Sequence, residues 1–106
     1  MDNSTLTLIA ASWLLDATIA EYEEGVRNGN VILVIEYQDA IGFISRSEAL
    51  LNDTIPTLSQ SMKISAEEAK KLYAELNSKV QSKADIKDIQ ISTNEIKQKI
   101  SNVTGF

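Results

Sequence analysis

The sequence predicts an all-α protein, an antiparallel up-down four-helix bundle, on three observations. Apolar residues recur at three- and four-residue steps through four separate segments of the chain. Short polar turns separate most of these segments, and such turns favour antiparallel neighbours. The only proline, Pro56, stands between the second and third segments, where a regular helix cannot pass through it. With 106 residues, 43% of them apolar, the chain is expected to form a single helical-bundle domain over residues 1–106.

The first helix is expected from about Thr5 to Arg27. Its main apolar stripe consists of Leu8, Leu15, Ile19, Tyr22 and Val26. Four further apolar residues widen this stripe near the start of the helix, namely Leu6, Ile9, Trp13 and Ala17. The wide apolar face predicts that the start of the helix is buried on more than one side, with Trp13 in the core. Gly29, in the polar run after Arg27, is suited to the left-handed C-cap that ends a helix.

The second helix is expected from Asn30 or Val31 to Leu51. Its opening run, Val31 to Ile35, is rich in β-branched residues and could by itself form a strand. Helical spacing is kept through Val34, Tyr37, Ile41, Ile44 and Leu51. No second strand is evident, and an isolated strand would leave its backbone groups unpaired. The run is therefore predicted to be helical.

Polar start signals place the last two helices. Residues 52–64 form a connection with a short helical turn around 57–62. Ser65 and Glu68 have the spacing of a capping box, so the third helix is expected to start at Ser65. Asp85 is expected to cap the fourth helix, and Gly105 to end it. The apolar stripe of the third helix consists of Ala69, Leu72, Tyr73, Leu76 and Val80. The stripe of the fourth helix consists of Ile86, Ile89, Thr93, Ile96, Ile100 and Val103.

Composition excludes several classes of function. The chain has no Cys and no His, so disulfides, zinc sites, thiol nucleophiles and imidazole acid–base chemistry are absent. A net charge of −5 argues against a nucleic-acid partner, which requires a basic surface. No stretch has the ~20 consecutive apolar residues of a membrane span, so no direct membrane insertion is expected. No nucleophile–base pair or glycine-rich phosphate loop stands out, which predicts a protein that is not an enzyme and carries no cofactor.

Acidic residues gather on both sides of the turn expected between the first two helices. They are Glu21, Glu23, Glu24, Glu36 and Asp39. Hard cations such as calcium and magnesium take several carboxylate oxygens, so Glu21, Glu24, Glu36 and Asp39 are candidate metal ligands. The alternative is a solvated acidic face that Arg27 partly neutralises, since the spacing matches no calcium-binding loop.

Three Asn-x-Ser/Thr triplets begin at Asn3, Asn52 and Asn102, at expected helix ends or loops. Such triplets accept N-linked glycans in secreted proteins, which predicts an extracytoplasmic glycoprotein at the cell surface or in the periplasm. The alternative is that Asn and Thr stand at these places as ordinary helix caps.

The order of the segments resembles a known family. Leu14 to Gly29 forms a helix with a polar turn, Tyr37-Gln38-Asp39-Ala40 and Glu48-Ala49-Leu50-Leu51 follow, and Lys83-Ala84-Asp85 leads into an Ile-rich helix. This is similar to the extracytoplasmic helical region that precedes the membrane part of FTR-type iron permeases in archaea and bacteria. The family's Arg-Glu-x-x-Glu iron motif belongs to the membrane helices and is absent here. The resemblance therefore implies an archaeal-like accessory domain with no iron ligand carried over.

Three functions remain open at this point. The first is a non-enzymatic, extracytoplasmic helical domain for interaction or assembly, accessory to a membrane transport protein, with a protein partner of unknown identity. The second is a cytosolic helical adaptor or an immunity-like protein that binds a protein partner. The third is a ligand or cation carrier that uses the acidic turn. A homodimer through the first helix and the run Val31 to Ile35 is also predicted, because both are more apolar than a bundle seam requires.

Overall fold

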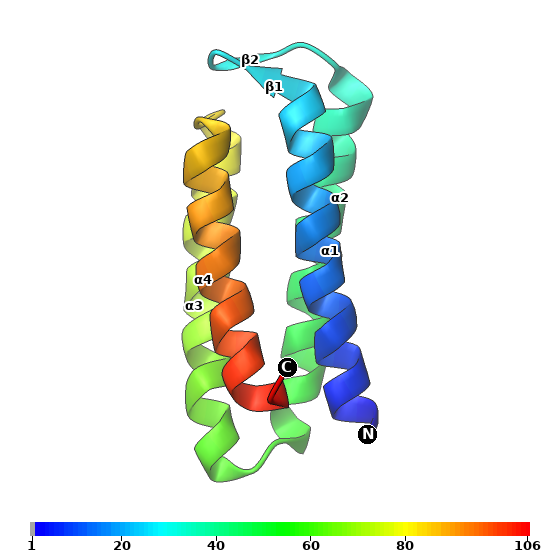
Figure 1. The fold of residues 1–106 in the computed structure, drawn as a ribbon, viewed down its shortest axis with the longest axis vertical. Coiled ribbons are helices and arrows are strands. Elements are labelled where there is room, and N and C mark those ends of the chain that lie inside the picture. Colours follow the sequence, from blue (N-terminus) through cyan, green and yellow to red (C-terminus); the bar gives the residue numbers. More distant parts are fainter. Residues whose placement is uncertain (1) are drawn as a thin grey trace.

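The computed structural model describes residues 2–106 and shows a rod of four long helices, 42 Å long and 19 Å across (Figure 1). The helices are α1 (Asn3–Gly25), α2 (Val34–Thr54), α3 (Gln60–Gln81) and α4 (Ile86–Thr104). They run alternately up and down, so the prediction of an antiparallel four-helix bundle is confirmed. None of the helices within residues 2–106 combines the length and the apolar character that a membrane crossing requires.

A single core runs along the axis of the rod. Its largest fully buried side chains include Leu8, Leu15, Tyr22, Ile44, Leu51, Tyr73, Leu76, Ile89, Ile96 and Ile100. All ten belong to the stripes expected from the sequence. Burying each of these side chains contributes about 1.5–3 kcal/mol, so the stripes hold the helices together.

A short β-hairpin joins α1 to α2, in a region that the sequence pattern assigned largely to helix. Strand β1 (Val26–Arg27) pairs antiparallel with β2 (Asn30–Val31). The two residues between them, Asn28 and Gly29, have φ values of 53° and 78°. Positive φ at both central residues is typical of the type I′ turn that Asn-Gly favours. The prediction of a left-handed Gly29 is correct, but it serves a hairpin and not a helix C-cap.

The prediction that α2 begins at Asn30 or Val31 is wrong, because the chain there is held extended. The backbone N–H groups of Ile32 and Leu33 both donate to the carbonyl oxygen of Gly25, at 2.8 and 3.2 Å. The helix begins only at Val34. The sequence pattern shows no partner for a strand at Val31, but the structure supplies one in β1. The apolar side chains at positions 32–35 are consequently exposed at one end of the rod.

The connection from α2 to α3 is shorter than expected. A 3₁₀ turn, η1 (Ile55–Thr57), accommodates Pro56 in its first turn, where a missing N–H costs nothing. Ser59 is then extended, and α3 starts at Gln60. Ser65 therefore lies inside the helix, and the predicted capping box is wrong.

The fourth helix has the ends that were predicted. The Asp85 carboxylate accepts a hydrogen bond of 2.9 Å from the backbone N–H of Lys87. Gly105 adopts a left-handed φ of 81° at the C-cap. Both caps are local features, so they could be identified from the sequence alone.

A buried hydrogen-bond chain crosses the middle of the bundle. The Ser47 hydroxyl of α2 donates to the backbone carbonyl oxygen of Ala11 at 2.7 Å and lies 2.6 Å from the Tyr73 hydroxyl of α3. Because Ser47 has one proton and gives it to Ala11, Tyr73 donates to Ser47. Burial raises the pKa of Tyr73 to about 12, so the phenol keeps its proton at neutral pH. These two hydrogen bonds link α1, α2 and α3.

Candidate functional site

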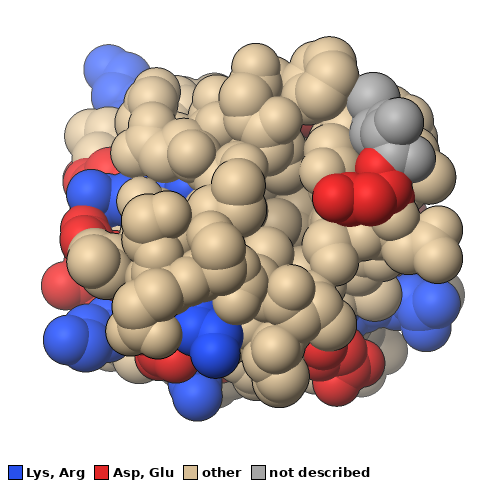
Figure 2. Space-filling view, turned by 90° about the horizontal axis from the view of Figure 1, so that it is seen from below, with Lys and Arg blue, Asp and Glu red and all other residues tan. Residues whose placement is uncertain are grey.

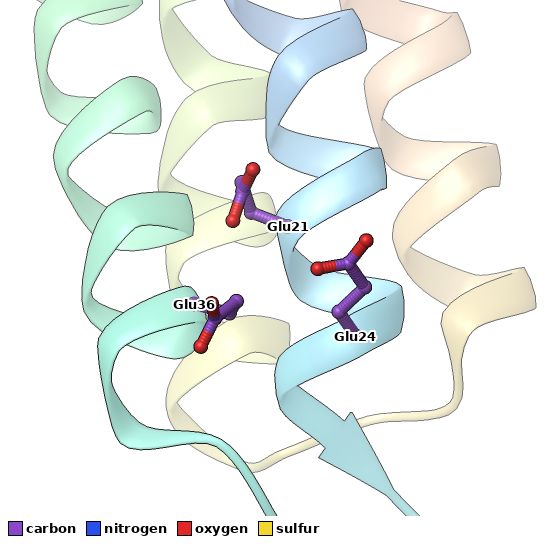
Figure 3. A group of neighbouring side chains, drawn as sticks. All are labelled: Glu21, Glu24 and Glu36. Atoms are coloured by element: carbon purple, nitrogen blue, oxygen red, sulfur yellow. The ribbon is translucent and has the colours of Figure 1, made fainter.

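Three glutamates meet where α1 ends and α2 begins (Figure 3). Glu21 and Glu24 lie in the last turns of α1, and Glu36 lies in the first turn of α2. One carboxylate oxygen from each comes within 4.8 Å of the other two. Glu21 and Glu36 are half-buried and Glu24 is exposed. Asp39, the fourth expected ligand, does not belong to this group.

The close packing of the helix backbones at this point depends on Gly25. A Cβ atom at Gly25 would lie 2.7 Å from the backbone nitrogen of Tyr37 and 3.1 Å from the carbonyl carbon of Glu36. The first distance is too short for any real side chain. A glycine therefore lets the end of α1 lie against the start of α2, and this brings Glu36 towards Glu21 and Glu24.

The cluster carries uncompensated negative charge. Desolvation raises the pKa of Glu21, and the negative charges of Glu24, Asp39 and Glu36 add to this effect. The two ion pairs found within residues 2–106 are Asp16–Lys97 and Glu68–Lys99. Neither involves the glutamates or Arg27, which was expected to neutralise them. Three converging carboxylate oxygens form part of the ligand set that a hard cation takes, with waters as the remaining ligands.

The outer face of α1 is apolar and exposed, which contradicts the prediction that Trp13 lies in the core. The Trp13 side chain is 68% exposed and that of Leu6 is 52% exposed. Trp13 borders a groove of about 410 Å³ between α1 and α4 and another of about 560 Å³ between α1 and α2. We call this region the Trp13 surface; it consists of Leu6, Ile9, Ala10, Trp13, Leu14 and Leu50. Exposed apolar surface of this kind marks interaction sites.

The end of the rod that holds both termini has a different character. Figure 2 shows mostly uncharged side chains across this end, with charges of both signs around its edge. A shallow hollow there is lined by Ser4, Thr57, Leu58, Met62 and Val103, among others. Among residues 2–106, this end therefore shows no continuous basic surface of the kind that nucleic acids require.

The three candidate glycosylation residues are all exposed. Asn3 is the first residue of α1, and Asn102 lies near the end of α4. Asn52 lies in the last turn of α2, because this helix continues to Thr54, beyond its predicted end. The Asn102 side-chain oxygen accepts a hydrogen bond of 3.2 Å from the Gln98 amide. All three asparagines are thus at helix ends, as expected.

Four antiparallel helices around one core define the class of small four-helix bundle domains. Within this class, the chain belongs to the iron permease-associated four-helix bundle domain family, whose model matches residues 2–106. This match confirms the resemblance to the FTR-type iron permease region. The family is transport-related, since its domains are associated with iron permeases. No curated protein and no solved structure matches the chain.

Proposed function

We propose that this chain is a non-enzymatic accessory domain of an iron permease and acts by binding a protein partner. The observation that carries the proposal is the Trp13 surface, where an indole ring stands largely in water among other apolar side chains. Tryptophan dominates the binding energy of many protein interfaces when it becomes buried. The family supplies the biological setting, since its domains are associated with iron permeases.

The proposed location is extracytoplasmic, at the cell surface or in the periplasm. The three Asn-x-Ser/Thr triplets, whose asparagines are all exposed, support it. Peptides that contain Asn3, Asn52 or Asn102, prepared from the native protein of its source organism, are then expected to carry glycans. Mass spectrometry of these peptides measures the added mass directly. Three unmodified asparagines would oppose the glycoprotein proposal and favour the alternative, a cytosolic adaptor or immunity-like protein.

The substitution Trp13→Glu tests the binding role. We expect the unmodified chain to co-purify with the iron permease of the same organism in detergent, and Trp13→Glu to reduce the recovered amount at least ~10-fold. The charge would have to be buried without a partner. Because the indole is exposed, the variant is expected to keep the helical circular dichroism and the melting temperature of the unmodified chain.

Ile91→Glu is the matched control. Ile91 is 54% exposed on α4 and does not line either groove beside Trp13. The proposal expects this variant to co-purify normally. Equal losses for the two variants would mean that added negative charge is responsible, and the absence of any co-purification with the unmodified chain would refute the accessory role.

A second function, cation binding at the acidic cluster, is supported by the converging carboxylates of Glu21, Glu24 and Glu36, with Asp39 as an outer contributor of negative charge. The association of the family with iron permeases points to a hard metal ion as the cargo. Terbium(III) is a suitable probe because it also prefers oxygen ligands. Tyr22 and Tyr37, next in sequence to two of the glutamates, are placed to sensitise its luminescence.

Glu36→Gln is expected to weaken terbium binding at least ~10-fold, because one of the three charged ligands is lost. Without metal, the same variant is expected to be more stable, since the Glu36 carboxylate lies within 4.8 Å of those of Glu21 and Glu24 and like charges repel. Titrations followed by luminescence and by thermal melting measure the two effects. Glu75→Gln, at an exposed position of α3, is the control. Equal terbium affinity for the unmodified chain and Glu36→Gln would exclude the site.

A further inference from the structure

Helix α1 has two apolar stripes, and the bundle covers only one of them. The inner stripe is buried and consists of Leu8, Ala11, Leu15, Thr18, Tyr22 and Gly25. The outer stripe consists of Leu6, Ala10, Trp13, Ala17 and Ala20. Both follow alternating steps of three and four residues, which is the spacing of a coiled-coil seam. A helix that is apolar on all sides is expected to be buried, so the outer stripe lacks a covering helix.

We infer that a second copy of this chain covers the outer stripe, with the two α1 helices packed antiparallel about a two-fold axis. This rests on the proposed function, in which the Trp13 surface is a protein interface, and it makes the dimer formed through that surface the form that associates with the permease. In the antiparallel register centred between Ala10 and Trp13, the Trp13 ring lies over Ala10 of the second copy. Leu6 then lies over Ala17 of the second copy. Each large side chain faces a small one, which is the arrangement that fills a helix seam without voids or clashes.

The distribution of charge selects the antiparallel orientation. Within its range, α1 contains no Lys or Arg, and three of its four acidic residues, Glu21, Glu23 and Glu24, lie near its C-terminal end. A parallel pair would bring these two acidic ends to the same level, where like charges repel. An antiparallel pair places them at opposite ends. Asp16, beside the stripe, already has a partner in Lys97 at 2.5 Å.

The dimensions of the bundle allow a contact of sufficient size. The outer stripe from Leu6 to Ala20 is about 21 Å long, at 1.5 Å per residue. A stable interface takes about 800 Å² from each partner, comparable to one whole side of a rod 42 Å long and 19 Å wide. The grooves on either side of Trp13 extend the contact onto α2 and α4. A stable contact of this kind therefore requires most of one side of each rod.

Sedimentation equilibrium on three variants tests the pairing. The unmodified chain is expected to dimerise, and Trp13→Ala to raise the dissociation constant at least ~10-fold. The exchange variant, Ala10→Trp with Trp13→Ala, restores a large residue opposite a small one and is expected to recover most of the affinity. Circular dichroism checks that each variant folds. A dimer that Trp13→Ala leaves unchanged, or that the exchange variant fails to restore, would overturn the proposed register.

Disulfide mapping tests the orientation, because the chain contains no cysteine of its own. Leu6→Cys and Ala17→Cys variants, mixed and mildly oxidised, are expected to form a mixed disulfide between the two chains. A parallel pair would instead link Ala17→Cys to a second Ala17→Cys chain. That result would refute the antiparallel arrangement, since a disulfide requires Cα atoms about 4.4–6.8 Å apart.

The same experiments separate this inference from the proposed function. A chain that stays monomeric at every concentration, yet loses co-purification with the permease in Trp13→Glu, would show that the permease itself occupies the Trp13 surface. The inference would then be wrong and the proposed function would stand. A monomer whose permease binding does not depend on Trp13 would overturn both.

Discussion

Replacing Gly25 with alanine is expected to lower the free energy of unfolding by about 1–3 kcal/mol, although alanine is the better helix former. The added methyl group would lie 2.7 Å from the backbone nitrogen of Tyr37. A backbone atom cannot rotate away as a side chain can, so α1 and α2 would have to separate. Urea denaturation measures the loss. A loss of this size would lower the melting temperature of a domain of ~100 residues by roughly 4–8 °C per kcal/mol.

Gly42→Ala is the matched control for this prediction. Gly42 lies in the exposed middle of α2, and a Cβ atom there would meet nothing within 4 Å. Alanine is expected to raise the stability by about 0.5–1 kcal/mol at such a position. If Gly25→Ala also stabilised the protein, the close approach of α1 and α2 would not exist. Gly25→Ala is further expected to weaken terbium binding, since it would move Glu36 away from Glu21 and Glu24.

The second large effect is expected for Ser47→Ala, which should cost about 1–3 kcal/mol. Ser47 is fully buried and accepts the hydrogen bond that Tyr73 donates. Alanine would leave the Tyr73 hydroxyl without an acceptor, and its raised pKa prevents relief by ionisation at neutral pH. Thermal and urea unfolding of the variant measure the loss.

Tyr73→Phe separates the lost hydrogen bond from the lost packing. In this variant Ser47 still donates to the carbonyl of Ala11, so the expected cost is smaller, about 0.5–1.5 kcal/mol. The double variant with Ser47→Ala should be less unstable than the sum of the two single changes, because it removes donor and acceptor together. Full additivity would mean that the two side chains do not interact.

Most of the core could be predicted from the sequence because apolar periodicity records which residues face inward. Periodicity cannot show which of two apolar stripes a bundle covers. In α1 both stripes have helical spacing, and only the structure shows that Trp13 lies on the uncovered one. The buried role of Ser47 also gives no signal in the sequence, because its partners lie on two other helices.

The errors at helix ends have local causes. Asn28-Gly29 is a hairpin signal, yet strands of two residues are too short to show alternation, so the sequence pattern predicts a helix end at this pair. Ser65 and Glu68 have capping-box spacing inside a continuous helix, because α3 starts earlier at Gln60. The antiparallel arrangement of the first two helices predicts the acidic group. It does not predict that Gly25 brings these glutamates together, since close backbone contact depends on the exact approach of the two helices.

The central claim is that this chain assists an iron permease through the Trp13 surface. Uptake of radioactive iron by cells that express the permease tests it most directly, with the unmodified chain, Trp13→Glu or Ile91→Glu supplied at equal levels. We predict that uptake with Trp13→Glu falls to the level seen without the chain, while Ile91→Glu supports normal uptake. Uptake that is the same with the chain, with either variant and without the chain would contradict the claim.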